Sequence, residues 1–557
     1  MSSAAAEPSA PLRRLARGPT SRWLLALLAV VLSVRLITLG TYPLTDTSEA
    51  RYAEIARVMR QTGNWVTPQE TPGTPFWAKP PLYAWLSVAS TYVLGTNEFA
   101  LRLPSLLCGF AVLLLCGLWA AALARRSSPL PPPSPPAPLP QAGEGSHSAA
   151  LSSQIGERSL ETPDRPSPAQ RERGGGEGQT ALLSCLILST TGFFIAYGAV
   201  MTDPALGFCT AWMMVAFQRA VIDGSGRAIW RYGFFVAGGL AMLAKGPVAF
   251  LYVALPIAIW AFWRRRWRLI WQALPWAGGI LLAAAIALPW YLWAERRTPG
   301  FLNYFLVGEH LMRFLQPGWS GDRYGNAHQE PIGTVWAYLA AALGLWSVAA
   351  LALAPPLRSW QARALAWCRD DARLFALLAA LAPLLVITFA RNLIWTYVLP
   401  ALPPLAALLA LELAQRSAQP GQWRRGVRLI AFASVAVVWV GATLWAPQRA
   451  NGSSFAGPVA AWREQAAARP GVLLYWGART PASLRFYSRG AAEPVPDLAA
   501  RLAQLQPGAR AYIAVAPEQL PALHELAASE PHALQMAVVA RVKHAAIVEM
   551  GRDLSAR

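Results

Sequence analysis

Charged residues are scarce in this chain of 557 residues, and the shortage excludes most classes of soluble protein. Asp, Glu, Lys and Arg make up only 14% of the sequence, whereas hydrophobic residues make up 55%. Ordinary soluble domains contain about 25% charged residues. Acidic residues are fewer than basic ones: the chain has 29 Asp and Glu and 49 Lys and Arg. The composition excludes an ordinary soluble enzyme and a disordered chain, and it favours a polytopic membrane protein.

Cysteine is also rare, which bears on disulfides and metals. The five cysteines are Cys108, Cys116, Cys185, Cys209 and Cys368. No two of them have metal-ligand spacing in a polar loop, so we expect neither a disulfide framework nor a zinc site. The sequence also lacks a Walker A loop and a Rossmann GxGxxG motif, and a soluble nucleotide donor is therefore not indicated.

Apolar runs near the ~20 residues that a bilayer demands recur along the chain. The first run, 22–41, follows a basic tail at 1–21 and is too long for the apolar part of a signal peptide. We expect it to be an anchor with a cytoplasmic N-terminus. Further spans are expected at 100–123, 181–197, 205–221, 232–244, 248–263, 269–293, 333–355, 374–390, 394–413 and 429–446. The two runs beside Lys245 are short and form either two helices or one broken helix.

The basic clusters give a test of this span count. With the N-terminus in the cytoplasm, the inside loops contain Arg125 with Arg126, Arg227 with Arg231, residues 264–266, 358–373 and 424–425. Cytoplasmic loops collect Lys and Arg, so the main clusters fall on the expected side. The formal net charge of +20 is then mostly a consequence of topology, and we expect no nucleic-acid partner.

Two segments differ in composition from the rest. Residues 127–179 are rich in Pro, Gly and Ser, and we expect a disordered cytoplasmic insertion without a function of its own. Residues 447–557 alternate expected strands (472–476, 511–516 and 536–542) with expected helices (482–488, 497–505 and 518–528). The second segment therefore predicts a small α/β domain, which span parity places outside.

Polar clusters gather in the outward loops, above all at 42–99 and 295–332. Asp46 and Glu49 have the D-x-x-E form of a capping box, which predicts the start of a helix. Catalysis by Asp46 is the equally weighted alternative. Lys79 precedes two prolines that stiffen the backbone, and it either snorkels at the membrane interface or contacts a phosphate.

Other outward residues also have a simple structural interpretation beside a functional one. Asp203 either caps the helix that begins at Pro204 or takes part in catalysis. Lys245 and Arg391 are either interfacial anchors or cations of a site, and they oppose the positive-inside trend. His310 and His328 lie in one loop, where a pair without a ligand role is the commoner case.

Together these residues place carboxylates and cations at one lipid–water surface. Carboxylates can deprotonate or orient an acceptor hydroxyl, and cations can stabilise a departing phosphate. A transporter would carry its ionisable groups near the bilayer midplane, so this clustering argues against that class. A membrane scaffold would leave the outward cations unexplained.

The loop motifs resemble a known enzyme family. DTSEARYAEIARVMRQTGNW, FWAKPPLYAW, MTDP, KGP, EHLMRF, AHQEP and TYVLP follow in the order found in bacterial GT-C glycosyltransferases of family 39. That family includes the protein O-mannosyltransferases and the aminoarabinose lipid A transferases. The resemblance covers 22–446 except the insertion. It implies a GT-C fold with about 11–13 transmembrane helices and inverting sugar transfer from an undecaprenyl-phosphate donor.

The resemblance also implies roles for individual residues. The first-loop carboxylate falls on Asp46 or Glu49, and the second on Asp203. The residues implied in substrate or phosphate binding are Arg51, Tyr52, Lys79, Lys245, His310, Arg313, His328, Arg391 and Tyr397. Related aminoarabinose enzymes have Glu immediately before the lysine, but this chain has Ala78, so we expect no metal cofactor.

The predicted protein is thus a multi-pass enzyme of the bacterial inner membrane with its active site on the periplasmic side. The expected acceptor is lipid A, another glycan or a protein. Protein O-mannosylation is one alternative activity, and a transporter or flippase of lipid-linked sugars is an alternative of another class.

Overall fold

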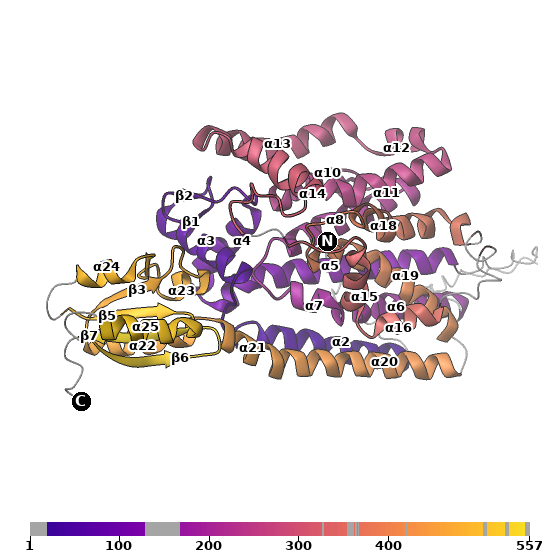
Figure 1. Ribbon diagram of the computed structural model, residues 1–557. Coiled ribbons are helices and arrows are strands. Elements are labelled where there is room, and N and C mark those ends of the chain that lie inside the picture. Colours follow the sequence, from indigo (N-terminus) through magenta and orange to yellow (C-terminus); the bar gives the residue numbers. More distant parts are fainter. Residues whose placement is uncertain are drawn as a thin grey trace, which may run out of the picture.

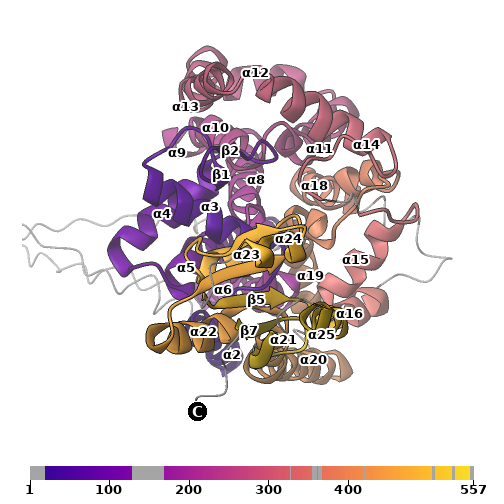
Figure 2. The ribbon, with the colours of Figure 1, turned by 60° about the vertical axis from the view of Figure 1, so that its left-hand side comes forward.

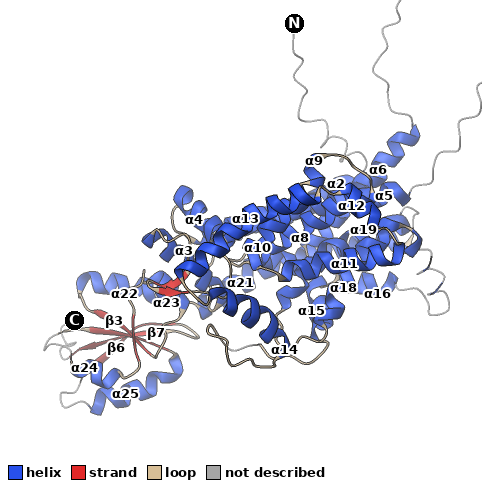
Figure 3. Cartoon of the chain, turned by 90° about the horizontal axis from the view of Figure 1, so that it is seen from above, coloured by secondary structure: helices blue, strands red, loops and turns tan. Residues whose placement is uncertain are grey.

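The computed structural model describes residues 19–127, 168–325, 328–353, 361, 365, 367–417, 421–504, 509–529 and 534–551. It consists of a long helical bundle with a mixed α/β domain at one end (Figure 1). Viewed from above, the strands gather in that end domain, apart from a small hairpin, and the rest of the described chain is helical (Figure 3). The predicted fold class, a polytopic helical membrane protein with a small C-terminal α/β domain, is confirmed.

Within the described ranges, six helical segments are long and apolar enough to cross a membrane. They are α2 (Pro19–Thr38), α5 (Glu98–Ser127), α8 with η1 (Asp203–Phe217 and Gln218–Ile222), α13 (Trp276–Arg297), η3 with α19 (Trp395–Ala401 and Leu402–Ser417) and α20 to α21 (Gln422–Val440 to Ala446–Ser453). Leu107 and Leu114 of α5 are more than half exposed. Apolar side chains on an outer surface suit contact with lipid.

Several expected spans are interrupted where the sequence disfavours a continuous helix. The pair α15 (Thr334–Leu343) and α16 (Trp346–Leu353) bends by 109° at Gly344. The run 181–197 is divided between α6 (Pro168–Ser189) and α7 (Gly192–Ala196). The Thr191 side chain accepts a hydrogen bond from Phe193 N and so caps the start of α7. Pro275 separates α12 (Trp267–Ala273) from α13.

The two short runs beside Lys245 are separate helices. Helix α10 (Gly233–Lys245) ends at Gly246, and α11 (Val248–Arg264) begins two residues later. Gly246 has φ of +82°, a conformation that residues with a Cβ rarely adopt. A Cβ there would lie 2.6 Å from the Phe305 ring. The KGP motif therefore encodes a tight turn between two helices.

The expected inside loops meet at one end of the bundle, which we call the basic end. Arg126 in the last turn of α5 pairs with Asp223 after η1 at 2.9 Å. Arg264 at the end of α11 pairs with Asp371 of α18 (Asp371–Ile387) at 2.7 Å. These contacts bring together loops that the span count assigned to one side.

The start of α6 differs from the sequence-based expectation. Residues 168–179 were expected to be disordered, but they form the first turns of α6. Pro168 suits the first helical position, and extending an existing helix avoids the cost of nucleating one. The remaining residues of the expected insertion, 128–167, lie outside the described residues.

The opposite end of the bundle, the loop end, holds the outward loops and the α/β domain. Here lie α3 (Ser48–Thr62), the hairpin β1–β2 (Gln69–Thr71 and Thr74–Pro75) and α4 (Leu82–Leu94). Helices η2 (Asn303–Met312) and α14 (Arg313–Leu315) follow α13. Figure 2 shows the α/β domain in front of this end, with α3 beside it.

The α/β domain is built on a mixed sheet in the order β4-β3-β5-β7-β6. Its strands are β3 (Val472–Trp476), β4 (Glu493–Val495), β5 (Ala511–Val515), β6 (Gln535–Arg541) and β7 (Ala546–Gly551). Alternate residues point to opposite faces. Leu473 and Tyr512 pack with the side of α22 (Ala456–Ala468) and α23 (Ala482–Tyr487), whereas Leu474 and Ile513 pack with the side of α24 (Leu498–Ala503) and α25 (Leu520–Ser529).

Candidate active site

Asp46 joins the first loop to the α/β domain. Its carboxylate accepts hydrogen bonds from the backbone N of Ser483, at 2.9 Å, and from the Ser483 hydroxyl. The capping-box prediction is wrong for this residue, because the N-cap of α3 is Thr47 and no side chain caps the helix. The Asp46 carboxylate, which the sequence pattern assigned to the start of the helix, instead binds Ser483 of the α/β domain.

Glu49 lies in a buried ion pair. Its carboxylate contacts Arg102 through Nε at 2.7 Å and through Nη2 at 3.1 Å. It also accepts from the backbone N of Thr45 and of Val200. The Arg102 side chain is fully buried and donates further to three carbonyl oxygens before α3. These contacts tie the first loop to α5 and to the segment before α8.

Five of the sequence-predicted residues line one small cavity of about 100 Å³, which we call the cation pocket. They are Lys79, Lys245, His310, Arg313 and Tyr397. Lys79 and Arg313 both contact the Glu309 carboxylate at 3.1 Å. Two cationic side chains from segments far apart in the sequence therefore meet at the Glu309 carboxylate, and Lys245 lines the same pocket.

Asp203 does not line this pocket, but it pairs with Lys245, which does. Lys245 donates to Asp203 at 2.6 Å, and its ammonium lies 4.9 Å from the centre of the Tyr397 ring. Both charged side chains are mostly buried. A buried ion pair at the turn after α10 fixes the direction of the Lys245 ammonium.

His310 does not have the arrangement of a metal ligand. Its Nδ1 lies 2.7 Å from the Phe305 carbonyl oxygen, and its Nε2 lies 3.2 Å from that of Lys245. Glu309 next to it is already held by two cations. Across the described residues, no three His, Cys, Asp or Glu side chains gather closely enough to hold a metal ion. The neighbours of His310 thus fit a hydrogen-bonding role.

Burial and neighbouring charges shift the pKa values in these loops. Burial favours the neutral form of Glu309, yet Lys79 and Arg313 hold the pKa of this carboxyl below its usual value. Burial disfavours the charged form of Lys79, but Glu309 outweighs it and raises the pKa of the ammonium. Burial lowers the pKa of His310, which keeps its ring neutral at neutral pH. Burial raises the pKa of Asp46 against the hydrogen bonds from Ser483.

Other predicted residues lie outside the cation pocket. Arg51 pairs with Glu70 at 3.0 Å, and Tyr52 packs edge-on against Phe76. Arg391 and His328 are exposed, and neither lines the pocket. Their backbones hold the 328–330 segment against the chain after α18.

Glu309 and Ser483 were not among the residues chosen from the sequence. The sequence signal available for Glu309 was its place in the EHLMRF motif, four residues before Arg313; its contact with Lys79 is a tertiary one. No sequence pattern connects Ser483 with Asp46, which lies 437 residues earlier in the chain.

An apolar groove of about 570 Å³ lies between α10, α11 and α13. Phe234, Gly238, Met242, Ile257 and Leu288 are among its lining residues. Met242 lies one helical turn before Lys245 on α10. The groove therefore approaches the helix end that carries a cation of the pocket.

Comparison with known proteins agrees with this architecture. The family model described as dolichyl-phosphate-mannose-protein mannosyltransferase matches residues 20–128 and 173–305. An undecaprenyl phosphate-alpha-4-amino-4-deoxy-L-arabinose arabinosyl transferase of Pseudomonas savastanoi pv. phaseolicola is 27% identical over 74% of this chain and 65% of its own length. A similarly named transferase of Pseudomonas fluorescens is 29% identical over 75% and 63%. The matches thus span slightly under two thirds of these relatives.

A crystal structure of ArnT from Cupriavidus metallidurans bound to undecaprenyl phosphate superposes with a TM-score of 0.69. The two are 19% identical, and the match covers 96% of this chain and 99% of that one. This chain has the GT-C fold and is similar to the aminoarabinose transferases. The resemblance stated from the loop motifs is confirmed.

Proposed function

We propose that this protein is a glycosyltransferase that moves a sugar from a polyprenyl-phosphate donor to an oxygen atom of an acceptor. The observation that carries the proposal is the cation pocket, in which Lys79, Lys245 and Arg313 converge. Cations aimed at one point stabilise a phosphate as it gains charge on leaving. Two carboxylates partly offset these cations, so a bound phosphate would complete their pairing.

The apolar groove supports a lipid-linked donor. Its lining is almost free of polar residues, and it leads along α10 toward Lys245. A polyprenyl chain in this groove would place its phosphate at the cation pocket. The relative of known structure was crystallised with undecaprenyl phosphate, a polyprenyl chain that ends in a phosphate.

The proposed step breaks the bond between the anomeric carbon of the sugar and the phosphate oxygen. The acceptor oxygen forms the new bond to that carbon, and the polyprenyl phosphate leaves with the electron pair. Where the acceptor is a hydroxyl, its proton passes to a carboxylate, for which Asp46 is the candidate. Where the acceptor is a phosphate oxygen, no proton has to be removed.

Each further residue receives a proposed role from its contacts. Asp203 orients Lys245, and Glu309 orients Lys79 and Arg313. Glu49 holds the first loop in place through Arg102. Tyr397 supports the Lys245 ammonium from its ring face.

The location follows from the same proposal. The basic end lies in the cytoplasm and the loop end on the periplasmic side of a bacterial inner membrane. Undecaprenyl-phosphate sugars and their acceptors would then meet at the membrane surface, where the cation pocket lies.

The test is sugar transfer by purified protein in detergent, with an undecaprenyl-phosphate aminoarabinose donor and lipid A as acceptor. Lys79→Ala should lower turnover about 10²–10³-fold by removing a cation from the leaving phosphate. Lys79→Arg should restore only part, since a planar guanidinium is a poor copy of a compact ammonium. The matched control is Arg60→Gln. It removes a cation of α3 that contacts Thr91 and Thr96 and does not line the cation pocket.

The family-model match to protein mannosyltransferases makes a protein acceptor the second candidate. A polyprenyl-phosphate mannose donor with a peptide acceptor tests it in the same assay. Transfer that requires sealed vesicles and never occurs in detergent would point to a transporter and overturn the proposal.

A further inference from the structure

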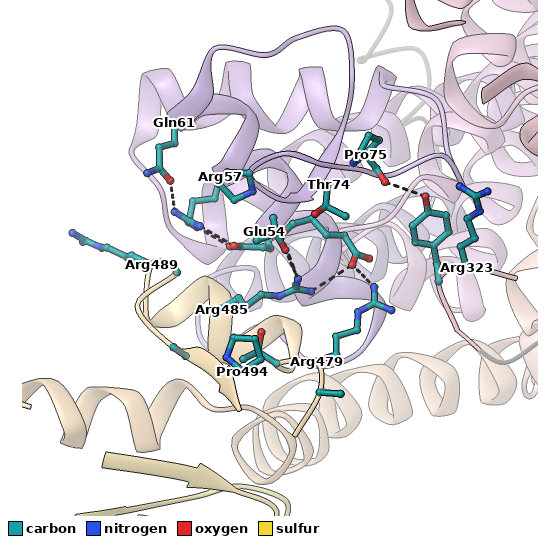
Figure 4. Close-up of a pocket in the computed structure, with 18 of the residues that line it drawn as sticks. Glu54, Arg57, Gln61, Thr74, Pro75, Arg323, Arg479, Arg485, Arg489 and Pro494 are labelled. Atoms are coloured by element: carbon teal, nitrogen blue, oxygen red, sulfur yellow. Dashed lines mark hydrogen bonds and ion pairs between the residues drawn. The ribbon is translucent and has the colours of Figure 1, made fainter. Parts of the chain in front are cut away.

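A second cavity lies between the first loop and the α/β domain, apart from the cation pocket. Its volume is about 590 Å³, and we call it the arginine cavity (Figure 4). The first loop contributes α3 and the β1–β2 hairpin, the 316–332 loop contributes Arg323 and Tyr324, and the α/β domain contributes residues 478–494. The cavity exists only because these three parts of the chain meet.

Its walls carry an excess of positive charge. The five arginines are Arg57, Arg323, Arg479, Arg485 and Arg489. The acidic residues in the walls are Glu54 and Glu70, which leaves three positive charges in excess. Glu54 pairs with Arg57 at 2.7 Å, and Glu70 pairs with Arg479 and Arg485.

Three of the arginines keep binding capacity for a ligand. Within the described residues, Arg323 and Arg489 have no carboxylate partner; both line the cavity and are exposed. The guanidinium of Arg323 instead lies over the rings of Trp77 and Tyr304, at 4.6 and 5.2 Å. The Nε of the buried Arg485 has no hydrogen-bond partner among the described atoms. Figure 4 shows Arg479 and Arg485 next to each other, with Arg323 at the right and the Arg489 side chain directed outward at the left.

The arginine cavity adjoins the cation pocket through one short segment. Pro75 and Trp77 line the first cavity, whereas Ala78 and Lys79 line the second. Two extended residues span at most ~7 Å, so Trp77 and Lys79 keep the two cavities within the reach of a single reaction centre. Tyr324 fixes this segment by donating to Pro75 O and accepting from Trp77 N.

We propose that the arginine cavity binds an anionic group, a phosphate or carboxylate, of the sugar acceptor. Guanidinium groups suit this role because each offers paired donors that match the oxygens of such an anion. The α/β domain then supplies Arg479, Arg485 and Arg489 to the acceptor site, so it is part of the substrate-binding machinery. This inference rests on the proposed function, since it takes the cation pocket as the donor site.

The experiment measures binding by the full chain in phosphatidylcholine nanodiscs, without requiring turnover. The acceptor probe is bisphosphorylated lipid A, compared with the same glycolipid after phosphatase treatment. The donor probe is undecaprenyl phosphate. The test variant is the double change Arg323→Gln with Arg489→Gln, which avoids the arginines paired to Glu70. Arg541→Gln, at an exposed position of β6, is the matched control.

We expect the double variant to bind phosphorylated lipid A about tenfold or more weakly, with little change for the dephosphorylated form. Undecaprenyl phosphate should bind as it does to the parent protein. Equal binding of both lipid A forms by the parent would overturn the inference. So would displacement of lipid A by phosphatidylglycerol at equal concentration, which would indicate a general headgroup site.

A failure of this inference differs from a failure of the proposed function. If only the acceptor site is wrong, Lys79→Ala still weakens undecaprenyl phosphate binding while the double variant binds lipid A normally. If the proposed function is wrong, Lys79→Ala leaves undecaprenyl phosphate binding unchanged.

Discussion

The carboxylate of Asp46 has its hydrogen-bond partners in another domain. Ser483 donates to it from both the backbone and the side chain, and these bonds favour the ionised carboxylate. Burial acts in the opposite direction and raises the pKa of Asp46 above its usual value. A carboxylate with a raised pKa is a stronger base once it is ionised, which suits proton removal from an acceptor.

The first prediction concerns the pH dependence of turnover. Ser483→Ala removes a hydrogen bond that lowers the pKa of Asp46, so the acid limb of the kcat profile should move to higher pH. Asp46→Asn should remove that limb and lower turnover about 10²–10⁴-fold. Ser488→Ala, whose hydroxyl contacts Arg485 O instead, is the control. An acid limb at the parental pH in Ser483→Ala would show that the contact does not tune the base.

Glu49 is the second carboxylate of the first loop, and its contacts differ from those of Asp46. Its partner Arg102 is fully buried, so losing the Glu49 charge would leave that guanidinium without compensation. The pattern that made Glu49 eligible for catalysis could not distinguish it from a structural ion pair.

The second prediction is that Glu49→Gln destabilises the protein, by up to about 3–5 kcal/mol, and leaves turnover per folded molecule close to the parental value. Thermal unfolding in detergent and turnover per folded molecule are the two measurements. Glu177→Gln, in the partly exposed pair with Arg125, should cost only about 0–1 kcal/mol. Parental stability with lost turnover in Glu49→Gln would assign catalysis to this residue.

Among the elements, α6 shows how a helix can continue into a segment of polar composition. Its first residues lie within the Pro, Gly and Ser-rich stretch, yet they extend the apolar helix that begins at about residue 181. Glu177 contacts Arg125 near the end of α5 at 3.0 Å. The two helices therefore remain neighbours beyond their apolar parts.

The third prediction separates the two parts of this stretch. Replacing 128–167 with a short Gly/Ser linker should leave transfer activity near the parental value, because this segment has little apolar content to bury. A deletion that continues to residue 179 also removes the first turns of α6 and should reduce the yield of folded protein. Protein yield and turnover check both variants. Lost turnover in a well-folded 128–167 deletion would reveal a role for the segment.

At the scale of the molecule, the basic helix ends and the two polar cavities lie at opposite ends of the bundle. The loops with Arg126 and Arg264 meet at the basic end, whereas the cation pocket and the arginine cavity lie at the loop end. Helices α20 and α21 lead directly from the bundle into the α/β domain (Figure 1). A domain joined in this way is held against the first loop by α23, which packs on α3.

The fourth prediction tests the orientation in the membrane. Alkaline phosphatase fused after residue 557 should be active, because this enzyme requires the oxidising periplasm. A fluorescent or galactosidase reporter inserted between 128 and 167 should behave as cytoplasmic. The opposite result at both positions would invert the proposed topology.

The sequence alone was enough for the fold class and for most of the cation pocket. Spans could be located because membrane helices need long apolar runs, whatever their neighbours. Lys245 could be chosen because a cation in an outward turn opposes the usual charge bias. Lys79 was indicated by the two prolines that follow it, and Arg313 by the resemblance of the EHLMRF motif. The role of Asp46 could not be settled, because a short D-x-x-E pattern also fits a helix cap that the folded chain does not use.

Local composition thus determined which segments of this protein enter the membrane and which end carries the polar loops. Only the tertiary structure decided which distant residues become partners, as Asp46 with Ser483 and Glu49 with Arg102. The arginine cavity also depends on tertiary contacts, because its residues come from the first loop, the 316–332 loop and the α/β domain. Hydropathy acts on each segment separately, whereas buried charges must find their partners across the whole folded chain.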